Sequence, residues 1–209
     1  MPKLRVNQSM QDFSLILHII AGFSALLIGT FVMFMKKGDN RHVLMGRVYF
    51  WSMMLVVATS LFLSIAKSNG FLLGVGIFVF YQAFAGMRSG SKKIMPAKWY
   101  DIAVLITAFA NAIFMVSTGN IVLIVFACIS FSLVFNDLKA YYSLYKKKEL
   151  KKLAWLARHI GMMVGSYIGT FTAFLVVNIQ LPANNWIIWI GPTLLFVPLL
   201  VFWTRKYAK

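Results

Sequence analysis

Two short segments of the sequence place a histidine among similar neighbours. They read RHVLM at 41–45 and RHIGM at 158–162, and each leads from a basic segment into a long apolar stretch. Neutral imidazoles on two helices at one depth can ligate haem iron from both of its faces, as in bis-histidine membrane cytochromes. We therefore predict that His42 and His159 form one cofactor site, with b-type haem for electron transfer as the first hypothesis.

Two carboxylates are also available at the edges of apolar stretches. The chain has five acidic residues and three histidines, and the acids at such positions are Asp101 and Asp137. Together with His42 and His159 they could hold a divalent metal such as zinc with an open coordination position.

Two interpretations without a cofactor stay open. In a proton-coupled transporter, histidine and aspartate side chains would form a proton relay. In a lipid-interacting protein, the arginines and histidines would contact lipid phosphates while the two aspartates neutralise nearby lysines.

Helical spacing adds polar neighbours to these residues, because positions about three, four or seven apart share one face of a helix. The shared faces hold Tyr49 and Met53 with His42, Ser166 and Thr170 with His159, and Tyr141 with Asp137. We expect these faces to point into the protein.

The third histidine, His18, lies near the opposite end of its apolar stretch. It shares a face with Gly22, Ala25 and Gly29, so it should point at another helix rather than at lipid. We expect either a packing or hydrogen-bonding role, or a separate outer ligand or proton site.

The composition requires a protein that spans a membrane. Of the 209 residues 60% are hydrophobic and 12% are charged, and the mean hydropathy is +0.78, whereas soluble domains are about half apolar and a quarter charged. A span needs about 20 mostly apolar residues. The sequence predicts an all-α polytopic transmembrane helix bundle, a single transmembrane domain over 1–209, with seven spans and with six or eight as alternatives.

The apolar stretches give the expected spans. They cover 13–35, 44–66, 70–87, 99–117, 120–143, 160–179 and 186–204. Little chain remains for a soluble catalytic domain, and the sequence has no HEXXH helix, GxSxG elbow or phosphate-binding Gly-Lys-Ser/Thr loop.

The charge distribution predicts an orientation. Most of the 21 lysines and arginines, which give a net charge of +16, lie after the odd-numbered spans, whereas Lys3, Arg5 and Lys67 lie on the other side. Cytoplasmic loops carry the excess of basic residues, so we predict the N-terminus outside and the C-terminus inside. Because each basic cluster borders an apolar stretch, we expect contact with anionic lipids and no binding of nucleic acid.

One basic segment, LYKKKELKKLAWLAR at 144–158, has apolar residues at helical spacing between its lysines. Such a pattern is typical of an amphipathic helix that lies in the lipid headgroups. We predict an interfacial helix over 144–158, with a solvated loop as the alternative.

A repeat of small residues marks the sixth span. Gly161, Gly165 and Gly169 follow one another at four-residue spacing, roughly opposite His159, which lets a neighbouring helix approach closely. The pattern favours helix packing and predicts self-association through this face.

An H-x-x-x-G-R-x-Y segment at 42–49, after an H-x-x-x-G segment at 18–22, resembles an uncharacterised family of predicted multi-pass bacterial membrane proteins, a domain of unknown function. The resemblance covers the first two spans best. The family often has arginine where this chain has Val43, and a Trp-Met pair after a later histidine, which His159 matches in position but without that pair. The resemblance implies a bacterial inner-membrane protein, and it transfers no activity because the family has none assigned. Its residues of interest correspond to His18, His42, Arg47 and His159.

Overall fold

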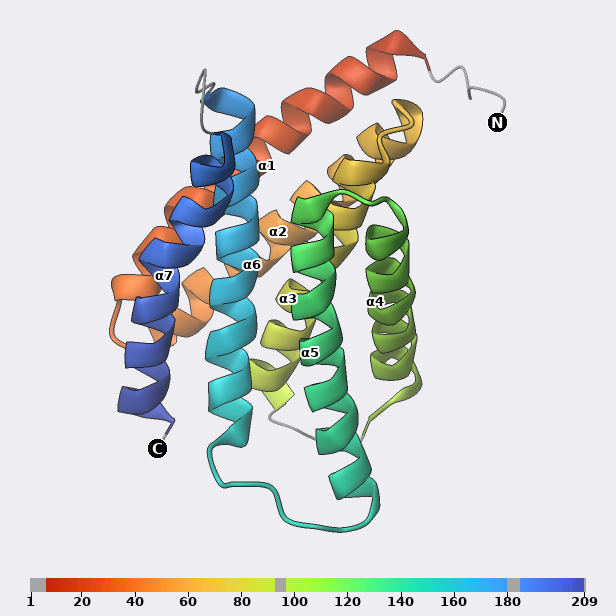
Figure 1. Cartoon of the computed structure of the whole chain (residues 1–209). Coiled ribbons are helices and arrows are strands. Elements are labelled where there is room, and N and C mark those ends of the chain that lie inside the picture. The colour runs from red at the N-terminus through yellow and green to blue at the C-terminus, as the bar shows by residue number, and fades with distance from the viewer. Residues whose placement is uncertain (1–6, 93–96, 180–184, 209) are drawn as a thin grey trace.

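A computed structural model describes residues 7–92, 97–179 and 185–208 and shows an all-helical bundle in these ranges (Figure 1). The helices are α1 (Gln8–Phe34), α2 (Asn40–Ala66), α3 (Gly70–Lys92), α4 (Trp99–Ser117), α5 (Ile121–Tyr145), α6 (Ala154–Asn178) and α7 (Asn185–Tyr207). All seven are long and apolar enough to cross a membrane. The prediction of a seven-span helix bundle is confirmed.

The outer surface of the bundle carries large apolar side chains. Phe13, Phe31, Trp51, Ile106 and Val177, on four different helices, are each more than half exposed. Such a surface suits lipid, whereas water would disfavour it. Backbone groups in lipid must be paired within the chain, and helices pair them locally, so the sequence folds as an integral membrane protein.

The middle of the bundle is formed by α3 and α6. Helix α3 packs against α2, α4, α5 and α6, and α6 also contacts α1 and α7. The two chain ends lie at opposite ends of the bundle (Figure 1). One end of the bundle, which we call the basic end, holds the last turn of α7 together with residues 35–39, 97–98 and 146–153.

Glycines allow α3 and α6 to pack closely. A β-carbon on Gly165 or Gly169 of α6 would lie 2.0 Å from Gln82 Oε1 or 2.8 Å from a Val79 methyl carbon of α3, whereas one on Gly161 would meet nothing within 4 Å. Gly165 and Gly169 therefore serve a contact within the chain, which is the close helix packing that their spacing predicts. Self-association through Gly161 stays a prediction.

The segment 144–158 does not form a separate interfacial helix. Residues 144–145 end α5, residues 146–153 form turns and irregular backbone, and residues 154–158 begin α6. Lys147 takes a positive φ of 55°, which interrupts a helix. The structure therefore shows a basic loop between α5 and α6, which was the alternative to the predicted interfacial helix.

Candidate functional site

The basic end contains a cavity of about 620 Å³, which we call the histidine cavity. His42 of α2 and His159 of α6 both line it, although they are far apart in the sequence. Its other walls come from the end of α1, the α1–α2 loop, the end of α3 and the end of α7. The size falls within the range of cavities that bind small molecules and cofactors, so the structure brings the two predicted histidines to one ligand-sized space.

The His159 ring is held by α3. Its Nδ1 lies 2.8 Å from the Gly86 carbonyl oxygen, and because a carbonyl only accepts, Nδ1 carries the proton. In the neutral ring the lone pair is then on Nε2. A β-carbon on Gly90 would lie 2.5 Å from Nδ1, so glycine at this position leaves the space that the ring occupies. A backbone carbonyl on one nitrogen is the usual partner of an imidazole that ligates a metal through the other.

His42 is placed by the start of α2. Gly38 takes a φ of +79° in the preceding turn, and Asp39 caps the helix by accepting a hydrogen bond from the His42 main-chain nitrogen at 2.7 Å. The side-chain Nδ1 of His42 is buried and has no hydrogen-bond partner among the described residues. An unpaired buried nitrogen costs about 1–3 kcal/mol, so this nitrogen is a local cost of the fold, while the residue itself lines the cavity.

Among the described residues, two cations line the histidine cavity, and they differ in their contacts. Lys37 donates hydrogen bonds to the carbonyls of Val32, at 2.9 Å, and Met33, and its Nζ lies 5.1 Å from the centre of the Trp203 ring. Burial lowers the pKa of Lys37, but its ammonium group caps the carbonyl end of α1 and is stabilised there.

Arg47 is exposed and lines the cavity, and no hydrogen bond or ion pair holds it within the described chain. The residues that line the cavity include no carboxylate. The site is therefore basic around an apolar interior, and the apolar part is formed by Val32, Met33, Ile160, Met163 and Val164, with the rings of Trp155, Trp203 and Tyr207.

The inward faces predicted for the second and sixth spans meet each other. The hydroxyl of Tyr49 lies 3.0 Å from Ser166 Oγ, and Thr170 donates to the sulfur of Met53 at 3.5 Å. These contacts show that both faces point into the protein, toward each other.

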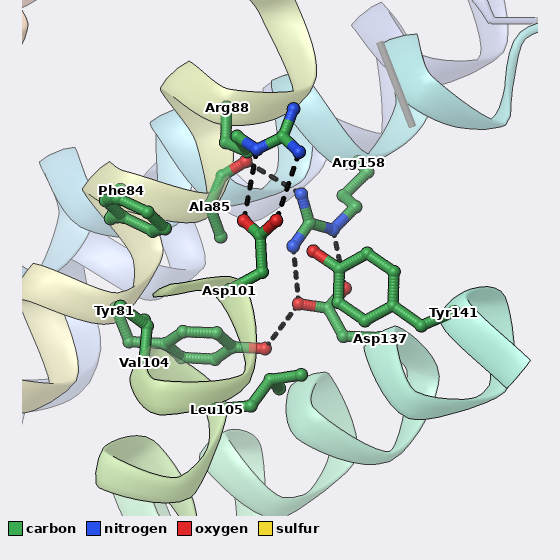
Figure 2. Close-up of a pocket in the computed structure, with 10 residues that line it drawn as sticks. All are labelled: Tyr81, Phe84, Ala85, Arg88, Asp101, Val104, Leu105, Asp137, Tyr141 and Arg158. Carbon is green, nitrogen blue, oxygen red and sulfur yellow. Dashed lines mark hydrogen bonds and ion pairs between the residues drawn. The ribbon is translucent and has the colours of Figure 1, made fainter. Parts of the chain in front are cut away.

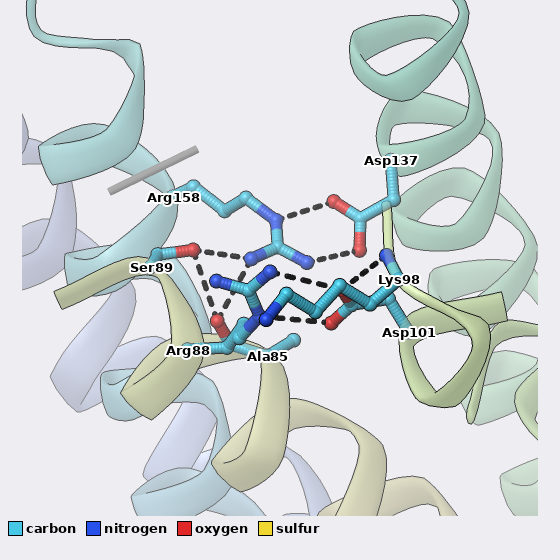
Figure 3. A network of polar contacts seen from close by, with 7 residues as sticks. All are labelled: Ala85, Arg88, Ser89, Lys98, Asp101, Asp137 and Arg158. Atoms are coloured by element: carbon cyan, nitrogen blue, oxygen red, sulfur yellow. Dashed lines mark hydrogen bonds and ion pairs between the residues drawn. The ribbon is translucent and has the colours of Figure 1, made fainter. Parts of the chain in front are cut away.

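The two aspartates lie in a separate network of buried charges (Figures 2 and 3). Arg158 of α6 forms two hydrogen bonds of 2.5 Å with Asp137 of α5, which also accepts one of 2.7 Å from the Tyr81 hydroxyl. Arg88 of α3 forms two hydrogen bonds of 3.0 Å with Asp101 of α4. We call these residues the ion-pair network.

The side chains of the ion-pair network leave little free space between them. Arg158 also donates to the Ala85 carbonyl at 2.8 Å and to Ser89, and Tyr141 lines the same space, as its shared face with Asp137 predicts (Figure 2). The space enclosed is only about 10 Å³, which is about the room for one water molecule. The network ties α3, α4, α5 and α6 together and has no room for a substrate.

The metal site of His42, His159, Asp101 and Asp137 is not present. The described part of the chain contains no group of three or more His, Cys, Asp or Glu side chains placed to hold a metal ion. The physical reason is that each aspartate is already paired with an arginine. Consecutive helical residues point about 100° apart, so Arg158 reaches α5 while His159 faces α3.

Sequence reasoning missed the two arginines as partners of the aspartates. It offered lysines instead, yet the Lys98 contact with Asp101 uses its main-chain nitrogen, at 2.9 Å. The feature that could have indicated these pairs is the planar guanidinium group, which binds a carboxylate through two parallel hydrogen bonds. Both arginines lie at the ends of apolar stretches, at the same end as the aspartates.

His18 forms hydrogen bonds between helices, which was one of the two roles expected for it. Its Nδ1 lies 3.0 Å from Thr59 Oγ1 and 3.2 Å from the Val56 carbonyl, both on α2. It therefore joins α1 to α2 away from the histidine cavity. The separate outer ligand site has no support here, because the partners of His18 are ordinary helix groups.

Comparisons of the chain with protein-family models, with curated proteins and with solved structures found no match. The chemistry of the site therefore follows from its own residues.

Proposed function

We propose that this integral membrane protein binds b-type haem in the histidine cavity and carries electrons. The observation that supports this proposal is that two histidines from different helices line one cavity of about 620 Å³. His159 donates a hydrogen bond through Nδ1 to the Gly86 carbonyl, as metal-ligating imidazoles commonly do through the nitrogen that does not bind the metal, and His42 lines the same cavity from the opposite helix.

The remaining walls match the other parts of a haem. A porphyrin has a flat apolar body, for which the cavity offers aliphatic and aromatic side chains, and two carboxylates, for which it offers basic residues and no acid of its own. Haem held by His42 and His159 would supply one-electron chemistry, and the hydrogen bond from His159 to the Gly86 carbonyl would tune it. In this role the chain's residues bind and orient the group.

The test is the visible spectrum of the purified protein. The full chain is produced in haem-replete cells, purified in detergent, and examined by absorption spectroscopy and haem extraction. Wild type should show the bands of a six-coordinate b-type haem. His42→Ala and His159→Ala should each remove that spectrum, and the double variant should be no worse than either single one, because both ligands serve one group.

His18→Ala is the matched control, since it removes an imidazole that lies outside the cavity and should leave the spectrum unchanged. A colourless wild-type preparation would reject the haem proposal, and so would a His18 variant that loses haem as completely as the His42 variant.

Binding of an anionic lipid is the second candidate. It is favoured by Arg47 beside an apolar interior, since a lipid also combines a negative group with an apolar body. A colourless protein that retains phosphatidylglycerol but not phosphatidylcholine after purification from mixed vesicles, and that loses this preference in Arg47→Gln, would favour the lipid over haem.

We further propose that the protein lies in a bacterial inner membrane with the basic end in the cytoplasm. The support is the clustering of basic residues at one end and the resemblance carried by residues 42–49. In this orientation the histidine cavity opens near the cytoplasmic surface.

A further inference from the structure

Residues of the segment H-x-x-x-G-R-x-Y at 42–49 form one wall of the histidine cavity. His42, Gly46 and Arg47 line the histidine cavity, and Tyr49 is buried beyond them, where it contacts Ser166 of the opposite helix. Three chemically different residues of one helix thus face the same space.

Gly46 leaves space beside the His42 ring. It lies one helical turn after His42, on nearly the same face, and a β-carbon built on it would meet no atom within 4 Å. The glycine is therefore not required by packing within the chain, in contrast to Gly90, whose missing side chain accommodates His159. The open space next to a ligating imidazole is where the body of a bound ligand would lie.

Arg47 is the cation of this wall that has no partner in the described chain. Lys37, the second cation among the described lining residues, already donates to carbonyls at the end of α1. Arg47 lies in the third turn of α2, near the start of the apolar stretch at 44–66. A guanidinium beside an apolar interior is costly without a counter-charge, so an anion in the cavity would stabilise it.

We propose that Arg47 binds a carboxylate of the cavity ligand and makes the site selective for ligands that carry acid groups. This inference rests on the proposed function, in which the ligand is haem and the carboxylates are its propionates. Two hydrogen bonds from a planar guanidinium fit a carboxylate, and no acidic residue lines the cavity to repel it. Arg47 then fixes the orientation of the ligand in the cavity.

The test compares haem with haem dimethyl ester, which keeps the iron and the flat body but has no negative charge. Full-length apoprotein from haem-deficient cells is titrated in detergent with each compound. Wild type should bind haem about tenfold or more tightly than the ester, which is the range expected for charge-assisted hydrogen bonds. Arg47→Gln should bind both compounds about equally.

Two further variants make the test specific. Arg41→Gln removes an exposed arginine that does not line the cavity, so it should keep the full preference for haem. Arg47→Lys keeps the charge and loses the planar pair of donors, so its preference should be intermediate.

The outcomes separate this inference from the proposed function. If wild type binds haem and the ester equally, or if Arg47→Gln keeps the tenfold preference, then Arg47 has no role in recognition although the haem site stands. If wild type binds neither compound, the proposed function itself is wrong and the inference falls with it.

Discussion

Replacing Asp137 by asparagine should destabilise the bundle strongly, because Asp137 holds the buried end of Arg158. In the structure, the side-chain exposure of Arg158 is 13% and that of Asp137 is 4%. The asparagine has nearly the same shape but no charge. It can accept from the Tyr81 hydroxyl or from the guanidinium, but it cannot neutralise Arg158.

The expected loss of stability depends on the hydrogen bonds that Arg158 retains in the variant. Removing one partner of a buried ion pair costs about 3–5 kcal/mol. Arg158 retains its hydrogen bonds to Ala85 and Ser89, so we expect the lower end, about 3 kcal/mol. Because 1.4 kcal/mol is a factor of ten, the unfolding equilibrium should shift by roughly a hundredfold.

The assay is equilibrium unfolding of the full chain in mixed micelles of dodecyl maltoside and SDS, followed by circular dichroism. Asp12→Asn is the control, since Asp12 is exposed and its side chain accepts a hydrogen bond from Gln8, also exposed, in the described part of the chain, so it should change stability by less than about 0.5 kcal/mol. The double variant Asp137→Asn/Arg158→Gln should lose less than the sum of its single variants, because the two side chains act as one pair.

A different result would refute the reasoning. If Asp137→Asn unfolds like wild type, or if the losses of the two single variants simply add, then Asp137 and Arg158 do not stabilise the bundle as a pair. The carboxylate would then be free for other chemistry, and the conclusion that the ion-pair network is structural would be wrong.

Three further predictions follow from individual contacts. Gly90→Ala adds a β-carbon 2.5 Å from the His159 imidazole nitrogen, so it should lower the stability by about 1–3 kcal/mol and weaken haem binding. Gly161→Ala adds a β-carbon that meets nothing within 4 Å, so it should change neither stability nor haem binding. Equal effects of the two variants in the unfolding assay and in haem titration would contradict this prediction. His18→Ala should cost about 0.6 kcal/mol, the average for a helix–helix hydrogen bond in lipid, and a loss above 2 kcal/mol in the same unfolding assay would indicate a larger role. Single cysteines at Ser117 and Lys148, in a background without the native cysteine, should react with impermeant reagents from outside and inside the cell respectively, and labelling of both from one side would overturn the orientation.

The seven helices were predictable from the sequence because each one is a local property. Apolar length decides whether a segment can enter lipid, and a segment in lipid must pair its backbone groups within itself. The similar position of His42 and His159 along their helices could also be predicted from local sequence, since both histidines lie near the starts of spans that run in the same direction. Helical spacing was enough to place Tyr49 and Ser166 on inward faces, where the structure pairs them.

The partners of the polar residues were decided by the tertiary structure. Asp137 and His159 could have shared a metal as far as the sequence goes, but the rotation of α6 points Arg158 at the carboxylate and His159 at α3. The same rotation covers Gly165 with α3. A sequence sets which face of a helix is polar, whereas the order of helices around the bundle sets what that face meets, and this order depends on packing between segments distant in the chain.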